Sequence, residues 1–131
     1  MPRTVKEMIE AANAVVKRVT PAEAGEMMAQ ANALVVDVRD GQEVEKSGKI
    51  KGAIHVSRGM LEFRADEGTP YHDASFARER PVIVYCASGG RSALAGKTLI
   101  DMGYSRVFNL GAYKDWVESG GEIETPLDPG M

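Results

Sequence analysis

The sequence contains a single cysteine, Cys86, among its 131 residues. One thiol cannot form an internal disulfide. The two histidines present, His55 and His72, are too few to complete a cysteine-rich zinc site with it, so we expect no bound metal. Any special role of Cys86 must therefore come from the reactivity of its thiol group.

Long apolar segments and basic clusters are also missing. No stretch approaches the roughly 20 apolar residues that cross a bilayer, and residues 1–7 lack the apolar core of a secretory signal. We therefore expect a cytoplasmic protein without a membrane partner. The net charge of -3 and the absence of a Lys/Arg cluster argue against a nucleic-acid partner. A hydrophobic content of 44% over 131 residues is typical of one soluble domain.

The spacing of apolar residues predicts alternating helices and strands. Helices are expected at residues 5–14, 21–30, 40–45, 57–64, 92–102 and 112–119, and strands at 33–38, 53–56, 81–85 and 106–110. Residues 15–19 form a further short apolar run, residues 65–75 read as a surface loop, and the Pro-rich tail reads as irregular. Strands separated by helices predict an α/β fold, in which helices cover both faces of a parallel sheet.

Cys86 follows the predicted strand at 81–85 and precedes the helix that begins near Ser92. Ligands of open α/β sheets bind at this end of a strand, close to the N-terminus of the next helix. Gly89 and Gly90 allow successive amides to curl around the sulfur as an anion-binding nest. The nest, the helix dipole and Arg91 are expected to lower the thiol pKa. A lone cysteine is usually inert in a core, but a packing cysteine needs no such surroundings.

The segment Cys86-Ala87-Ser88-Gly89-Gly90-Arg91-Ser92 resembles the active loop of the rhodanese family, Cys-x-x-Gly-x-Arg-Ser. Residues 36–39 resemble the family's Asp-x-Arg strand end, residues 48–56 its Gly-His-Ile-x-Gly-Ala segment, and residues 111–116 its closing Gly-Gly-x-x-x-Trp. The resemblance spans roughly residues 18 to 125.

Some parts of the chain depart from the family pattern. Lys49 stands where the family usually has His, which puts a structural hydrogen bond in doubt. Ala112 replaces a common second Gly, which puts a backbone turn in doubt. The helix at about 4–14 is an addition, so the expectation is a single rhodanese-like domain, 1–131, with an extra N-terminal helix.

The resemblance implies a three-layer αβα fold with a central, mainly parallel sheet of about five strands. It also implies a sulfurtransferase in which thiosulfate or a similar small donor loads Cys86 as a persulfide. Cyanide, a thiol or a sulfur-accepting protein then removes the sulfur, and no cofactor is needed beyond this covalent intermediate. The amides of residues 87–92 would hold the persulfide, and Arg91 would brace the loop or meet the anionic donor.

Other charged residues have two readings. Asp37 and Arg39 resemble the family's supporting pair, although a solvated salt bridge is an equal alternative. Arg58 follows the strand at 53–56 and could reach an anionic substrate, although a solvated face is the milder reading. Residues 43–46 read as a solvated helix face, and both histidines as structural or exposed.

Three other functions compete with sulfur transfer. Cell-cycle phosphatases share the rhodanese fold, but their Cys-x5-Arg loop is longer than the four residues between Cys86 and Arg91. A persulfide carrier that serves a partner protein would use the same Cys86, and the loop, nearly neutral apart from Arg91, leaves that alternative open. A silent binding domain ranks last because the loop is complete. We expect a monomer or a weak homodimer formed through the N-terminal helix.

Overall fold

The computed structural model describes residues 2–125. Its helices are α1 (Val5–Val15), α2 (Pro21–Gln30), α3 (Gly41–Ser47), η1, a 3-10 turn (Arg58–Met60), α4 (Leu61–Ala65), α5 (Gly90–Asp101) and α6 (Tyr113–Glu118). Its strands are β1 (Lys17–Arg18), β2 (Leu34–Asp37), β3 (Lys49–Ile50), β4 (Ile54–His55), β5 (Val82–Cys86), β6 (Val107–Ala112) and β7 (Ile123–Glu124). None of the helices within 2–125 is long and apolar enough to cross a membrane.

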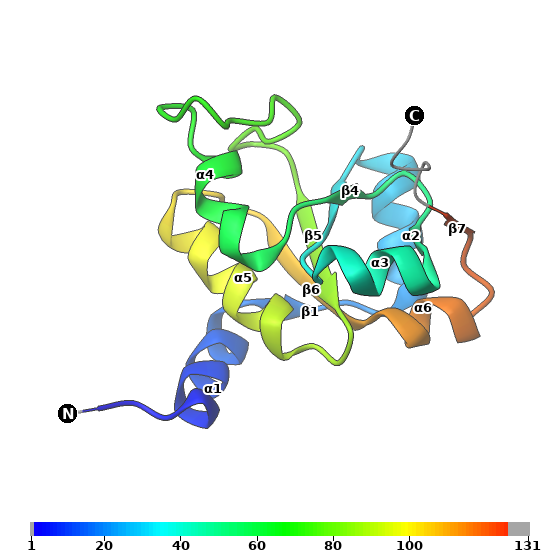
Figure 1. Cartoon of the computed structure of the whole chain (residues 1–131), viewed down its shortest axis with the longest axis horizontal. Coiled ribbons are helices and arrows are strands. Elements are labelled where there is room, and N and C mark those ends of the chain that lie inside the picture. The colour runs from blue at the N-terminus through cyan, green and yellow to red at the C-terminus, as the bar shows by residue number, and fades with distance from the viewer. Residues whose placement is uncertain (1, 126–131) are drawn as a thin grey trace.

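Five strands form one parallel sheet in the order β1-β6-β5-β2-β4. Helices α1, α4 and α5 lie on one side of it, and α2, α3 and α6 lie on the other (Figure 1). One apolar cluster fills each interface, around Val84 and Leu99 on the first side and around Ile83 and Trp116 on the second. The three-layer αβα architecture with about five parallel strands is therefore confirmed.

Local signals explain where several helices begin. Thr4 caps α1 and Thr20 caps α2, each accepting from the amide of a Glu three residues later, whose carboxylate accepts from the threonine amide. Pro21 occupies the first turn of α2, where its missing N–H costs nothing. These signals are local, so the sequence predicts the start of α2 at residue 21 correctly.

Several boundaries differ from the predictions, among them the start of α5 and the structure of the tail. Helix α5 begins at Gly90, two residues before the predicted start, because Gly89 adopts a left-handed conformation with φ of 103° that lets the chain turn directly into the helix. The tail was predicted to be irregular, but Ile123–Glu124 forms β7, which pairs antiparallel with β3. The Lys49 ammonium donates to the Ala53 carbonyl and to the Glu124 carboxylate at this small sheet. Lys49 thus makes hydrogen bonds of its own at the position where the family usually has His.

Candidate active site

Cys86 ends β5, which lies in the middle of the parallel sheet. Its side chain is 1% exposed, whereas Ala87 and Ser88 are exposed on the loop that follows. The short connection from β5 to α5 brings the amides of the first helical turn toward the sulfur. The structure therefore gathers the predicted loop residues around Cys86.

The Cys86 sulfur accepts hydrogen bonds from two backbone amides. Gly89 N lies 3.0 Å and Ser92 N lies 3.4 Å from Sγ, and the Ser92 hydroxyl oxygen also lies 3.4 Å away. Burial raises the pKa of the Cys86 thiol, but the hydrogen bonds from Ser92, Gly89 and Ser88 outweigh it and hold the pKa below its ordinary value. The loop thus favours the thiolate, which is the nucleophilic form.

Asn109 on β6 makes hydrogen bonds to two groups of the Cys86 loop. Its Oδ1 accepts from the Ser92 hydroxyl at 2.8 Å, and its Nδ2 donates to the Gly89 carbonyl at 3.4 Å. Both Asn109 and Ser92 are buried. Sequence reasoning missed Asn109, and the only signal for it was a polar residue inside an otherwise apolar strand.

Arg91 pairs with Glu43 on α3. Its Nη1 and Nη2 lie 2.6 and 2.9 Å from the two carboxylate oxygens of Glu43. The hydrogen bonds from Arg91 lower the pKa of Glu43 to about 2, and the pairing with Glu43 raises the pKa of Arg91. This bidentate pair braces the loop against α3. Of the predicted solvated face, Glu45 and Lys46 are exposed, whereas Glu43 is half-buried in the pair.

Asp37 and Arg39 form a buried pair at the end of β2. Arg39 Nη2 lies 2.7 Å from Asp37 Oδ2, and the two side chains are 3% and 0% exposed. The guanidinium also donates to the Ser47 hydroxyl at 2.8 Å and to the Gly48 carbonyl at 2.6 Å. The alternative of a solvated salt bridge is therefore wrong. Because these contacts join β2 to the end of α3 and not to the Cys86 loop, they fit a supporting role.

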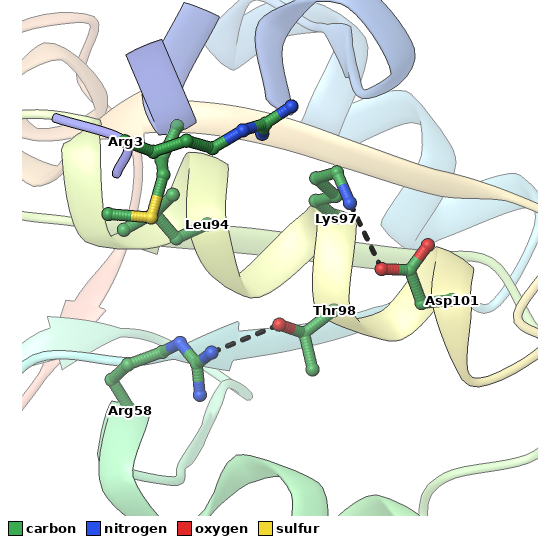
Figure 2. Close-up of a pocket in the computed structure, with 7 residues that line it drawn as sticks. Arg3, Arg58, Leu94, Lys97, Thr98 and Asp101 are labelled. Atoms are coloured by element: carbon green, nitrogen blue, oxygen red, sulfur yellow. Dashed lines mark hydrogen bonds and ion pairs between the residues drawn. The ribbon is translucent and has the colours of Figure 1, made fainter. Parts of the chain in front are cut away.

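Arg58 lies in a different part of the molecule from the Cys86 loop. It lines a cavity of about 270 Å³ between α1, η1 and α5, and Cys86 is not among the lining residues. Arg58 Nη2 donates to Thr98 Oγ1 at 3.0 Å (Figure 2). Its Nη1 donates to Glu62 at 2.9 Å. Thr98 follows Ser92 by almost two turns of α5, about 9 Å along the helix axis. The expectation that Arg58 could reach the substrate of Cys86 is not supported by this geometry.

The histidines lie apart from the sulfur. His55 Nε2 is 2.6 Å from the Arg39 carbonyl oxygen, and His72 lies in the loop before β5. In the described part of the chain, no three His, Cys, Asp or Glu side chains gather as metal ligands would. The polar groups that surround Cys86 therefore come from its own loop, from the first turn of α5 and from Asn109.

Comparison with known proteins relates this geometry to a family. The Rhodanese-like domain family matches residues 20–119. A thiosulfate sulfurtransferase, GlpE, from Glaesserella parasuis is 31% identical over 113 residues, which is 86% of this chain and 93% of that protein.

The fold of this chain is also similar to that of solved structures. A polysulfide-sulfur transferase homodimer from Wolinella succinogenes is 31% identical, covers 96% of this chain and 90% of its own, and has a TM-score of 0.73. A Rhodopseudomonas palustris protein of unknown function, described as a possible tyrosine phosphatase, is 38% identical with a TM-score of 0.86, and the match covers 95% of this chain and 96% of that one. With residues 20–119 matched and the Cys86 loop in place, the chain belongs to the rhodanese-like domain family.

Proposed function

We propose that this protein is a rhodanese-type sulfurtransferase that carries a sulfane sulfur as a persulfide on Cys86. The observation that carries the proposal is the Cys86 sulfur itself, which lies within 3.0 to 3.4 Å of the Gly89 amide, the Ser92 amide and the Ser92 hydroxyl. The thiosulfate sulfurtransferase and polysulfide-sulfur transferase named among its relatives support the same chemistry.

With thiosulfate as donor, the cycle has two balanced steps. The Cys86 thiolate attacks the outer sulfur, a new S–S bond forms at Sγ, and the S–S bond of thiosulfate breaks so that its electron pair leaves with sulfite. The terminal sulfur of the persulfide then bonds to an acceptor such as cyanide, which forms thiocyanate and returns the electron pair to Sγ. The amides around the sulfur hold the negative charge in both states. No metal or organic cofactor takes part in these steps.

Intact mass spectrometry tests both steps in one preparation. Incubation with thiosulfate should add the mass of one sulfur atom to the wild-type protein, and cyanide should then remove it. Cys86→Ser should show no added mass and no turnover. Added sulfur on Cys86→Ser, or none on the wild type with any sulfane donor, would refute the proposal.

The same assay separates an enzyme from a persulfide carrier. Because Glu43 neutralises Arg91, the loop presents no free cation to a small anionic donor. We therefore expect slow turnover of thiosulfate and cyanide. Discharge of the persulfide by a partner protein, with no discharge by cyanide or small thiols, would assign the protein to the carrier class.

Phosphatase chemistry is disfavoured by the loop. Four residues separate Cys86 from Arg91, and the Arg91 guanidinium is held in a bidentate pair with Glu43. A phosphate monoester would have to compete with Glu43 for the one guanidinium of this loop. Incubation with an aryl phosphate at neutral pH should release no phosphate beyond that seen with Cys86→Ser, and sustained release would favour the phosphatase.

A further inference from the structure

The proposed function leaves an electrostatic problem at the site. A thiolate must be approached by an anionic donor, and like charges repel at close range. Both arginines of the family motifs already have carboxylate partners. Arg91 pairs with Glu43, and Arg39 pairs with Asp37. Besides the loop amides, a cation near the loop without a carboxylate partner would attract an anionic donor.

Arg18, at the end of β1, lies beside the loop. It is opposite Asn109 in the parallel pairing of β1 with β6, and paired residues project from the same side of a sheet. Asn109 contacts Ser92 and Gly89 of the Cys86 loop. Arg18 lies at the edge of the sheet, and it also lines a hollow with Glu23 of α2 and Asp115 of α6 from the other side.

Gly111 makes room for the Arg18 guanidinium. A methyl group on Gly111 would lie 2.5 Å from Arg18 Nη2 and 3.1 Å from Cζ, so the guanidinium rests against the bare backbone. Gly111 in turn adjoins the loop, since its Cα would lie 3.6 Å from a methyl group on Gly89. Arg18 is therefore separated from the Gly89 backbone by a single residue without a side chain.

Arg18 also keeps its charge available. It is exposed, and no ion pair or side-chain hydrogen bond joins it to another of residues 2–125. Glu23 and Asp115 line a hollow of about 310 Å³ with Arg18, but neither carboxylate pairs with it. Glu23 instead accepts from the Thr20 amide at 2.8 Å.

We propose that Arg18 is a substrate-positioning residue that attracts the anionic end of the sulfur donor while Cys86 attacks its outer sulfur. The inference rests on the proposed function and deepens it by naming a residue that would position the anionic donor. It also explains how a loop with no free cation can accept such a donor.

Kinetics with thiosulfate give the first test. Arg18→Ala should lower kcat/KM for thiosulfate about tenfold, through a higher KM, as expected for loss of a charged hydrogen bond. Arg18→Lys should recover most of this loss because it keeps the charge. Lys17→Ala is the matched control, since Lys17 is also exposed and cationic but projects from the opposite side of β1. Equal losses in the Arg18 and Lys17 variants would overturn the inference.

Alkylation of Cys86 gives a second test that needs no sulfur transfer. Iodoacetate and iodoacetamide react with the same thiolate, and only the first carries a negative charge. Arg18→Ala should lower the ratio of the iodoacetate rate to the iodoacetamide rate, whereas Lys17→Ala should leave it unchanged. A lowered ratio in a protein that takes up no sulfur from any sulfane donor would keep Arg18 as an anion-positioning residue and refute the proposed function. Wild-type turnover with an unchanged ratio and KM in Arg18→Ala would refute the role of Arg18 alone.

Discussion

At the scale of single residues, the Ser92 hydroxyl is the most constrained group of the site. It carries one proton but lies 2.8 Å from Asn109 Oδ1, 3.2 Å from the Gly89 carbonyl and 3.4 Å from Cys86 Sγ. A hydroxyl donates one hydrogen bond at a time. It can donate to Asn109 while Cys86 is a thiol, and must turn toward the sulfur to stabilise the thiolate. The hydrogen bond to Asn109 thus keeps the Ser92 hydroxyl beside the sulfur while Cys86 is protonated.

Replacing Ser92 with alanine should raise the pKa of Cys86. Burial raises this pKa, and the hydrogen bond from the Ser92 hydroxyl is the largest of the contacts that lower it, so its loss should move the pKa upward. Below that pKa the thiolate fraction, and with it the rate of alkylation by iodoacetamide, falls. The pH dependence of that rate measures the midpoint. Ser88→Ala keeps the backbone amide and should keep the wild-type midpoint, whereas an unshifted midpoint in Ser92→Ala would contradict the assignment.

The sequence predicts the residues of this loop because they are adjacent in the chain. Cys86, the glycines and Ser92 form one segment whose spacing alone indicates a nest. Glu43 and Asn109 could not be predicted in the same way, because they reach the loop from 48 residues before Arg91 and 17 residues after Ser92. Nothing in their own neighbourhoods indicates which distant side chain they meet.

At the scale of elements, the approach of α5 to the sheet depends on Gly96. A methyl group at this position would lie 2.9 and 3.0 Å from the two Cγ atoms of Val16 and 3.5 Å from Val107. Val16 is 2% exposed and fills the space that a side chain on Gly96 would need. The glycine therefore sets how closely α5, which carries the loop, packs against the segment between α1 and β1.

Gly96→Ala should destabilise the protein by about 1 to 3 kcal/mol, because overpacking against Val16 outweighs the helix propensity of alanine. Gly25 in α2 provides the matched control, since nothing lies within 4 Å of its missing side chain. Gly25→Ala should stabilise the protein by about 0.5 to 1 kcal/mol. Urea unfolding measures both changes. A smaller loss for Gly96→Ala in a Val16→Ala background than in the wild type would identify the contact.

Helices whose capping residues stand next to them in the sequence are predicted well. Short strands that form only by pairing with a distant segment are not predicted. Helix α2 has its predicted bounds because Thr20, Pro21 and Glu23 mark its start within four residues. Strand β7 has two residues and no periodicity, and it forms because the chain returns to pair with β3. A pairing between such distant segments leaves no periodic pattern in the sequence of either one.

At the scale of the whole molecule, Arg39 joins elements of different layers. Its side chain contacts Asp37 on β2, Ser47 and Gly48 at the end of α3, and the ring of Tyr113 on α6 at 4.2 Å. Desolvation lowers the pKa of Arg39, but the hydrogen bonds and charge of Asp37 raise it above its ordinary value, so the guanidinium stays charged inside the protein. Replacing one partner of such a pair lowers the stability of the protein, because the other charge is left buried without its partner.

Arg39→Lys should therefore lower the free energy of unfolding by about 3 kcal/mol, since an ammonium keeps the charge but cannot reach all these acceptors at once. Arg58→Lys is the matched control: its pair with Glu62 is 30% and 47% exposed, and its loss should cost less than about 1 kcal/mol. Below the melting temperature of the Arg39 variant, sulfur transfer per folded molecule should match the wild type, because Arg39 makes no contact with the loop. Loss of turnover without loss of stability would instead place Arg39 in the chemistry, and urea unfolding beside a kinetic assay separates the two outcomes.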